Sequence, residues 1–308
     1  MGCPKLDELP PPPPGKQGWP WSEAATQLPE TMLNGISWPR ISIVTASLNQ
    51  GRFIEETIRS VLLQGYPNLE YIIIDGGSSD NTVEIIRKYA AWLAQWVSEP
   101  DEGQSAALAY GFSAATGDIL AWINSDDIFN RGAFNIVAEA FRRSHADVVF
   151  GNILLIDESA KHVGERRLAP YIRLFCSPGL MYGGFGIYQP AAFWTRRIYD
   201  KSGGVDRSFR FCMDNDLLIR FAMNKANFKF VRRFLAAFRA HPGSKTSTLR
   251  DVSSEEYRRL TERLPRISRL RRVLSKGCCW GWRLLYHTCH LEFGHLLSRR
   301  IGAYKWIP

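Results

Sequence analysis

Short apolar segments alternate with helical segments through the first half of this chain, and this rhythm restricts its fold more than any other feature. Three mostly apolar runs predict strands, at residues 41–45, 71–74 and 119–123, and residues 95–98 also resemble a strand. The segments between them predict helices, near residues 53–62, 81–93 and 103–115. Strands and helices in this order form a parallel sheet with right-handed crossovers. We therefore expect an α/β fold, with a mostly parallel sheet flanked by helices.

Polar residues stand where three of these strands end. Thr45 closes the first strand, Asp75 follows the second, and Asp126 and Asp127 follow the strand at 119–123. Because ligands of parallel sheets bind at the carboxyl ends of the strands, these residues predict a site. Burying two adjacent carboxylates costs several kcal/mol unless a cation or donors compensate, and Mg²⁺ or Mn²⁺ shared with a diphosphate would do so. Alternatively, the two aspartates only open a turn or cap the next helix.

Four motifs carry a family resemblance. They are ISIVTASLNQ at 41–50, EYIIIDGGSSD at 70–80, DEGQ at 101–104 and NSDD at 124–127. In this order they resemble the family 2 glycosyltransferases, and the similarity extends from about residue 40 to residue 246. The resemblance implies the GT-A fold, a Rossmann-like, mostly parallel sheet flanked by helices. It also implies inverting transfer of a sugar from a nucleotide-diphosphate donor.

The resemblance assigns roles to residues of these motifs. Thr45, Ser47 and Asp75 would hold the nucleoside, and Asp75 would accept a hydrogen bond from the base. Asp127 would bind a divalent metal, Mg²⁺ or Mn²⁺. Asp126 would contact the ribose or belong to the metal shell, so it counts both as a nucleotide-sugar residue and as a metal residue.

Asn124 departs from the family pattern, because it stands where the usual D-x-D motif has its first aspartate. The departure shifts metal binding to the two aspartates at 126 and 127 and leaves open which of them touches the ion. It also favours an alternative function, a non-catalytic scaffold that binds nucleotide sugars or glycans with a GT-A fold.

Asp214 and Asp216 lie in an acidic segment that begins an apolar helix. As a helix cap, such an acid would stabilise the helix by roughly 0.5–2 kcal/mol. The segment is similar to the acidic motif of the family, in which a carboxylate takes the proton of the acceptor hydroxyl. By that match Asp214 is the catalytic base and Asp216 the structural cap, with Asp216 as the alternative base. Proton removal in the transition state contributes roughly 10²–10⁴-fold to such reactions.

Four further residues match family positions around the site. His241 would contact the metal or the phosphates, and Lys245 would stabilise the negative charge that develops on the diphosphate. Gln189 and Trp194 resemble the segment that lines the acceptor pocket, where aromatic side chains stack on sugar faces. The plain alternatives are a packed or surface histidine and a core tryptophan.

The composition divides the chain into three parts. Residues 1–39 include five consecutive prolines at 10–14 and predict a proline-rich tail, partly disordered or draped over the domain. Residues 40–249 would form the GT-A domain, and residues 250–308 a basic, amphipathic helical tail. The six cysteines show no regular framework and the N-terminus has no apolar signal core, which predicts a cytoplasmic protein.

The C-terminal tail carries a net charge of +8 out of +9 for the whole chain. Leucines recur there at near-helical spacing, and Trp280, Trp282 and Tyr286 follow. Basic amphipathic helices with such aromatics suit an anionic membrane surface, so we expect peripheral binding to the inner face of the plasma membrane. Nucleic acid is the rival partner of a basic tail, but nothing resembles a nucleic-acid-binding motif. Alternatively, the tail packs on the domain and leaves a solvated basic face.

Together these features predict an inverting, metal-dependent glycosyltransferase that uses a UDP- or dTDP-sugar. Its acceptor would be a glycan or a lipid-linked glycan in surface polysaccharide synthesis. The motifs do not specify the sugar or the linkage, because those depend on loop shapes.

Overall fold

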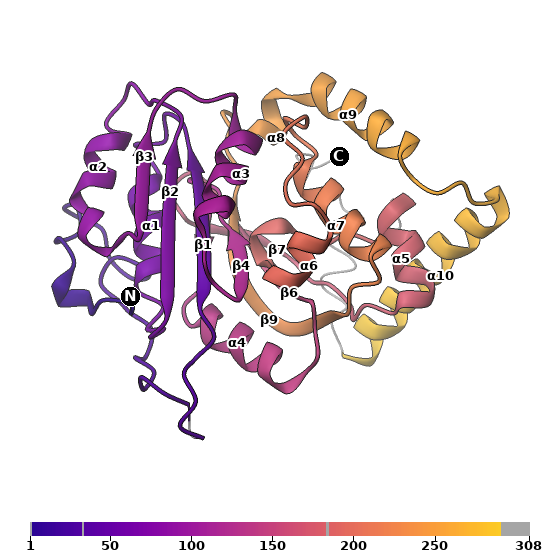
Figure 1. The fold of residues 1–308 in the computed structure, drawn as a ribbon, viewed down its shortest axis with the longest axis horizontal. Helices are drawn as coiled ribbons and strands as arrows, with labels where there is room; N and C mark the ends of the chain where they lie inside the picture. Colours follow the sequence, from indigo (N-terminus) through magenta and orange to yellow (C-terminus); the bar gives the residue numbers. More distant parts are fainter. Residues whose placement is uncertain (1, 33, 183–184, 291–308) are drawn as a thin grey trace.

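In the computed structural model, which describes residues 2–32, 34–182 and 185–290, nine strands form one sheet. Their order is β3-β2-β1-β4-β8-β6-β9-β5, with β7 paired to β6 (Figure 1). The strands are β1 (Ile41–Ser47), β2 (Leu69–Asp75), β3 (Gln95–Ser98), β4 (Ile119–Trp122), β5 (Ile128–Phe129), β6 (Val148–Ile156), β7 (His162–Arg166), β8 (Ala192–Thr195) and β9 (Phe228–Arg239). The four predicted strands are parallel neighbours. Beyond β4, β8 is antiparallel to both β4 and β6, β9 pairs parallel to β6, and β5 is antiparallel to β9. The expected mostly parallel α/β sheet with flanking helices is confirmed.

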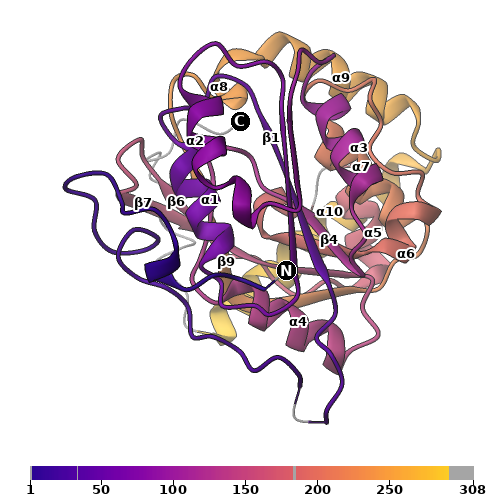
Figure 2. The ribbon, with the colours of Figure 1, turned by 60° about the vertical axis from the view of Figure 1, so that its left-hand side comes forward.

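Helices cover both faces of this sheet, as Figure 2 shows for α1 and α2 on one side of β1 and α3 on the other. The α-helices are α1 (Ile54–Leu62), α2 (Thr82–Lys88), α3 (Gln104–Ala114), α4 (Ala133–Arg143), α5 (Arg173–Tyr182), α6 (Arg196–Lys201), α7 (Met213–Met223), α8 (Lys245–Thr248), α9 (Arg250–Glu262) and α10 (Arg269–Cys289). Three 3₁₀ turns are η1 (Leu6–Glu8), η2 (Ala90–Trp92) and η3 (Gln189–Ala191). Neighbouring residues of β1 serve opposite cores, because Val44 packs on the α3 side and Ile43 on the α1 side. A strand that is buried on both faces has a largely apolar sequence, which is why a strand such as β1 could be predicted.

The N-terminal segment lies over α1 and is fastened there by Arg59, whose side chain is fully buried. Its guanidinium donates hydrogen bonds to the carbonyl oxygens of Pro20 (3.1 Å), Pro10 (2.8 Å) and Trp21 (2.9 Å), and to the hydroxyl of Tyr89 (3.1 Å). One cation therefore satisfies carbonyls from distant parts of a segment that forms almost no regular structure. This arrangement is the draped one of the two states expected for residues 1–39.

We expect Arg59→Ala to lower the free energy of unfolding by about 3 kcal/mol, because it leaves buried carbonyls without donors. Arg131→Ala is the matched control: Arg131 also joins the N-terminal segment, through Glu23 at 2.9 Å, but both side chains are about half exposed. Such a surface pair contributes less than about 1 kcal/mol. Urea unfolding followed by tryptophan fluorescence measures both. Equal losses in the two variants would contradict the buried-clamp interpretation.

The described part of the C-terminal segment consists of α9 and α10. Leu260 and Leu264 are buried in the core that also contains residues of α7. Trp282 of α10 donates its indole N–H to the carbonyl oxygen of Pro170 at 2.9 Å. The described tail thus packs in part on the preceding domain, while residues 291–308 of the predicted tail lie outside the described residues. Among the described helices, none combines the length and the apolar character that crossing a membrane requires.

Candidate functional site

The carboxyl ends of β1, β2 and β3 meet at one edge of the sheet. Ser47 pairs in register with Asp75, and Asp75 pairs with Ser98. The Asp75 carboxylate is fully buried and accepts hydrogen bonds from the hydroxyls of Ser78 (2.5 Å) and Ser98 (2.8 Å) and from the Ser78 amide (2.8 Å). Asp75 therefore fixes the loop that follows β2, and its present hydrogen bonds use both carboxylate oxygens.

Ser47 and Thr45 differ in where their hydroxyls point. The Ser47 hydroxyl is buried and has no hydrogen-bond partner among the described residues, and Ser47 lines the large cavity described below. The Thr45 hydroxyl contacts the hydroxyl of Tyr71 at 3.1 Å inside the core. An unpartnered buried hydroxyl is costly, so of these two residues Ser47 is the one whose hydroxyl a ligand group could satisfy.

The turn after β4 points the two aspartates that were predicted as metal ligands in different directions. Asp127 is fully buried, and its carboxylate accepts hydrogen bonds from the Arg239 amide (2.8 Å) and from the side-chain amide of Asn124 (3.1 Å). Burial, together with the negative charge of Asp126, raises the pKa of the Asp127 carboxyl well above its usual range. Asp127 points into the protein, whereas Asp126 lines the cavity.

Asp126 contacts a second predicted metal residue. Its carboxylate lies 2.9 Å from Nε2 of His241, and the side chains of the two residues are 19% and 7% exposed. The His241 ring packs against Phe53, with 4.9 Å between ring centroids. The structure therefore brings Asp126 and His241 together at the end of β4, and packing fixes the orientation of the ring.

The residues that support this turn from the protein interior were not predicted from the sequence. Arg239, at the end of β9, is fully enclosed, and its guanidinium donates to the Asp126 carbonyl (2.7 Å) and to the carboxylate of Glu56 (2.7 Å). From α1, the Thr57 hydroxyl contacts the Asp127 carbonyl at 2.7 Å. These groups satisfy the backbone of the turn and so aim the Asp126 carboxylate outward.

A chain of amide hydrogen bonds connects the turn to Lys245. Asn124 accepts a hydrogen bond from Gln104 (2.7 Å), and Gln104 accepts one from the Lys245 ammonium (2.8 Å). Gly103 precedes Gln104 with φ at 110°, a conformation that favours glycine, and this bend lets α3 begin at the cavity wall. Lys245 is exposed within the cavity, yet crowding by surrounding atoms, and next the charge of Arg210, lower the pKa of its ammonium.

Asn124 is therefore a connector. Its nitrogen donates to Asp127 and its oxygen accepts from Gln104, a pair of roles that an aspartate at this position could not fill while ionised. This is a physical reason for the departure from the D-x-D pattern.

Asp214 and Asp216 occupy different environments at the start of α7. Asp214 lines the cavity, and one of its carboxylate oxygens accepts from the Asn215 amide at 2.7 Å. The other oxygen has no hydrogen-bond partner among the described residues. The carboxyl is closely surrounded by cavity walls although part of the residue is exposed, and this desolvation raises its pKa to about 6. Asp216 is buried and pairs with Arg220 at 2.5 Å, so it forms an ion pair within the helix rather than the expected cap.

Glu256 of α9 satisfies the N-terminus of α7 instead. Its carboxylate is buried and accepts hydrogen bonds from the backbone amides of Arg210 (2.6 Å), Phe211 (2.8 Å) and Cys212 (2.8 Å). A carboxylate that collects orphan amides at a helix start stabilises that end of the helix. Through these bonds α9 fixes the loop that leads to Asp214.

Five of the ten predicted site residues line one cavity of about 1060 Å³. Its wall includes Ser47, Asp126, Gln189, Asp214 and Lys245. Small-molecule sites commonly have volumes of about 300–1,000 Å³, so this cavity has room for a nucleotide sugar together with part of an acceptor. The carboxylates of β4 and α7 thus face one shared space although their segments lie far apart in the sequence.

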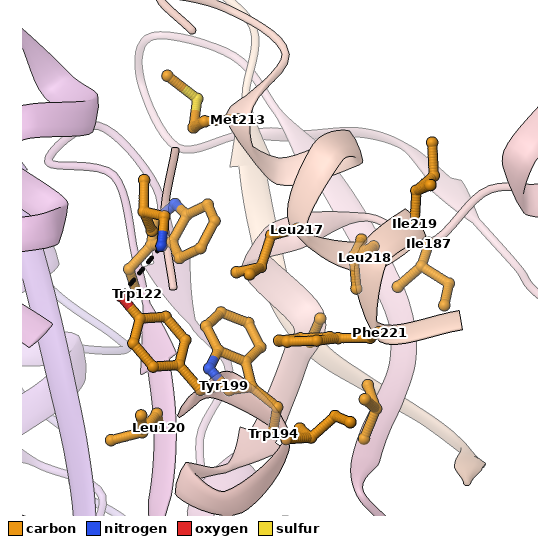
Figure 3. Close-up of a cluster of buried hydrophobic side chains, with 14 of the residues drawn as sticks. Leu120, Trp122, Ile187, Trp194, Tyr199, Met213, Leu217, Leu218, Ile219 and Phe221 are labelled. Carbon is orange, nitrogen blue, oxygen red and sulfur yellow. Dashed lines mark hydrogen bonds between the residues drawn. The ribbon is translucent and has the colours of Figure 1, made fainter. Parts of the chain in front are cut away.

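The two predicted acceptor residues separate in the structure. Gln189 lines the cavity, and its side-chain amide donates to the Trp122 carbonyl at 2.6 Å. Trp194 is 1% exposed and packs in the core, as Figure 3 shows with Trp122, Tyr199 and Phe221 nearby. Its ring lies 5.3 Å from that of Trp122, so it adopts the core position that the sequence left as the alternative.

Few side chains at the cavity could act as ligands of a divalent cation. Within the described residues, no group of three or more His, Cys, Asp or Glu side chains is arranged to hold a metal ion. Among the carboxylates at the cavity wall, Asp126 stands in the turn after β4 and fits a cation that takes its other ligands from phosphate oxygens and water, as Mg²⁺ commonly does. The residues therefore fit a metal that arrives with the diphosphate.

Comparison with known proteins identifies the family. The sequence model of a protein family described as glycosyl transferase family 2 matches residues 42–203, slightly more than half of the chain. An uncharacterized glycosyltransferase of Nostoc is 30% identical over 131 residues, which cover 39% of this chain and 41% of that protein. The putative glycosyltransferase EpsE of Bacillus subtilis is 30% identical over 192 residues, covering 60% of this chain and 67% of EpsE.

Solved structures show the same fold at lower identity. TarS of S. aureus, in complex with UDP-GlcNAc, has a TM-score of 0.59 and 17% identity, covering 72% of this chain and 64% of that one. The mannosyltransferase PcManGT of Pyrobaculum calidifontis, in complex with GDP-Man and Mn²⁺, has a TM-score of 0.56 and 15% identity, covering 94% and 86%. The chain therefore belongs to glycosyl transferase family 2 and has the GT-A fold.

Proposed function

We propose that this protein is an inverting, metal-dependent glycosyltransferase that moves a hexosyl group from a UDP- or dTDP-sugar to a glycan or lipid-linked acceptor. The reaction would serve surface polysaccharide synthesis at the cytoplasmic face of the plasma membrane. The observation that carries the proposal is the shared cavity, in which Asp126 and the carboxylate of Asp214 face the same space. The family and the nucleotide-sugar complexes of similar structures support it.

The donor would occupy the end of the cavity beside β1 and β4. The unpartnered Ser47 hydroxyl would hydrogen-bond the nucleoside, while Thr45 and Asp75 would shape that wall from behind. Asp126 would hold Mg²⁺ or Mn²⁺, oriented by its contact with His241, and Asp127 would support the turn. When bound, the cation would neutralise the leaving diphosphate as a Lewis acid. Lys245, which is linked to the same turn through Gln104, would add positive charge.

Asp214 would act on the acceptor. Its free carboxylate oxygen would take the proton of the acceptor hydroxyl as that oxygen forms a bond to the anomeric carbon. The bond from this carbon to the diphosphate oxygen breaks at the same time, and its electron pair leaves with the nucleotide. Attack opposite to the leaving group inverts the anomeric configuration. Gln189 would help to position the acceptor, whereas Trp194 would support the wall from within the core.

Slow hydrolysis of donors without an acceptor provides the test. We expect the purified protein with Mn²⁺ to release UDP or dTDP from members of a nucleotide-sugar panel, and to release none in the presence of a chelator. Calorimetric titration of the same donors measures binding separately. Binding without hydrolysis or transfer to any glycan would favour the non-catalytic scaffold, and failure to bind any nucleotide sugar would overturn the proposal.

A further inference from the structure

Helix α10 carries a stripe of large apolar side chains that face away from the protein. The outer stripe, as we name it, consists of Leu270 (68% exposed), Val273 (60%), Leu274 (56%), Trp280 (66%), Leu284 (39%) and Leu285 (56%). Spacings of three, four and seven residues place these side chains along one side of the 21-residue helix. Figure 1 shows α10 at the outer edge of the molecule beside α5.

The opposite side of α10 is already packed against the protein. Ser275 and Cys279 are buried, and Trp282 donates its indole N–H to Pro170. The ring of Tyr286 lies 6.1 Å from that of Phe230. Of the three aromatic residues expected to meet a membrane, only Trp280 faces outward. The helix is thus apolar on two sides, and the contact with the domain accounts for one of them.

The charges of α10 indicate what the outer stripe meets. Arg269, Arg271, Arg272 and Lys276 lie in its first half, and the sequence from 269 to 289 contains no aspartate or glutamate. A second copy of this helix, packed in parallel on the outer stripe, would bring these cations against each other, and an antiparallel copy would leave them without counter-charges. Anionic lipid headgroups would instead neutralise them while the apolar side chains enter the acyl boundary.

We propose that α10 lies in the headgroup layer of an anionic bilayer, with the outer stripe inserted among the acyl chains. The same helix lines the reaction cavity through Arg272 and Arg283, so docking would hold that end of the cavity beside the lipid surface. This placement would present a lipid-linked acceptor to the site, and that part alone rests on the proposed function.

Cosedimentation of the full chain with vesicles tests the docking directly. The probes are vesicles of phosphatidylcholine alone and of phosphatidylcholine mixed with phosphatidylglycerol. We expect binding to the mixed vesicles, and a bound fraction that persists at high salt because insertion is not screened. The double variant Leu274→Gln/Trp280→Gln should lower the partition coefficient at least about tenfold, since each change removes apolar area that enters the bilayer. Arg271→Gln/Lys276→Gln should mainly remove the salt-sensitive part of binding.

A matched control alters exposed apolar residues elsewhere. Ile36 is 60% exposed and Tyr110 is 49% exposed, so Ile36→Gln/Tyr110→Gln changes similar surface away from α10 and should bind as the wild type does. Circular dichroism verifies that all variants fold. Equal binding of the Leu274/Trp280 variant and the wild type would overturn the proposal. So would a wild-type dimer, seen by analytical ultracentrifugation, that this variant converts to a monomer. Vesicle binding requires no turnover, so its failure would leave the donor-hydrolysis test unaffected.

Discussion

Asp214→Asn should lower kcat for sugar transfer by at least about a hundredfold while leaving donor affinity nearly unchanged. The amide keeps the shape of the side chain but cannot take the proton of the acceptor hydroxyl, a function that contributes roughly 10²–10⁴-fold. The wild type should also show a characteristic pH profile. Burial raises the pKa of Asp214 to about 6, so kcat/KM should fall as pH drops through that value. Steady-state kinetics from pH 5 to pH 8 measures both effects.

Protein stability separates loss of the base from loss of the fold. The folded-state pKa of Asp214 lies above its unfolded value, so the stability that this carboxyl contributes is present below the unfolded pKa and is lost as pH rises through about 6. Asp214→Asn removes a charge that destabilises the folded state at neutral pH, so the variant should be at least as stable as the wild type.

Asp216→Asn is the matched control for Asp214→Asn. It weakens the buried pair with Arg220 and should lower stability, while the folded enzyme retains proton transfer. Normal transfer by Asp214→Asn together with an inactive but folded Asp216→Asn would show that Asp216, not Asp214, is the base.

The sequence predicted those parts of the fold that short-range patterns encode. The strands β1, β2 and β4 are buried on both faces, so their residues form largely apolar runs that need no knowledge of their partners, whereas β3 is a half-buried edge strand. The later strands were not predicted. β9 contains Lys229, Arg232 and Arg233 among its apolar residues, and it becomes a strand because it pairs with β6 and β5.

The functional site also contains residues that could be predicted from the sequence and residues that could not. Position after a strand located Asp126, because topology alone brings strand ends to one edge, whereas Asp214 was assigned through the family resemblance. Side-chain direction was beyond such reasoning: Thr45, Asp127 and Trp194 turn into the protein because of the pleat and the local turn. Glu256 was missed for another reason. Its partners lie more than 40 residues away, and a glutamate in a charged helix has the sequence signature of a solvent-exposed residue.

Gln104 could have been found. It opens a helix directly after a glycine, at the carboxyl edge of the sheet, and a polar side chain there has few places to point except into the site.

Removal of divalent metal should abolish sugar transfer, and Asp126→Asn should do the same even when metal is in excess. Asp126 is the member of the aspartate pair whose carboxylate faces the cavity, so its charge is the one available to a cation beside the diphosphate. Such a cation contributes several kcal/mol of stabilisation, which predicts a loss of at least about a hundredfold. Calorimetric titration of Mn²⁺ in the presence of UDP should show weakened binding by this variant, a result that does not depend on turnover.

Two further variants serve as controls for the metal prediction. Glu102→Gln removes another carboxylate from the cavity wall, but Glu102 is 81% exposed and pairs only loosely with Arg207 at 3.4 Å. It should keep both activity and metal affinity. Asp127→Asn replaces one of the two accepting carboxylate oxygens with an amide NH₂ group, so either the Arg239 amide or the side-chain amide of Asn124 would face another donor. The variant should therefore lose more stability than affinity for Mn²⁺. Full turnover of the wild type in the presence of a chelator would contradict the proposal that Asp126 binds a metal required for transfer. If Asp127→Asn loses Mn²⁺ binding while Asp126→Asn retains it, Asp127 is the ligand, and the turn must open when the donor binds.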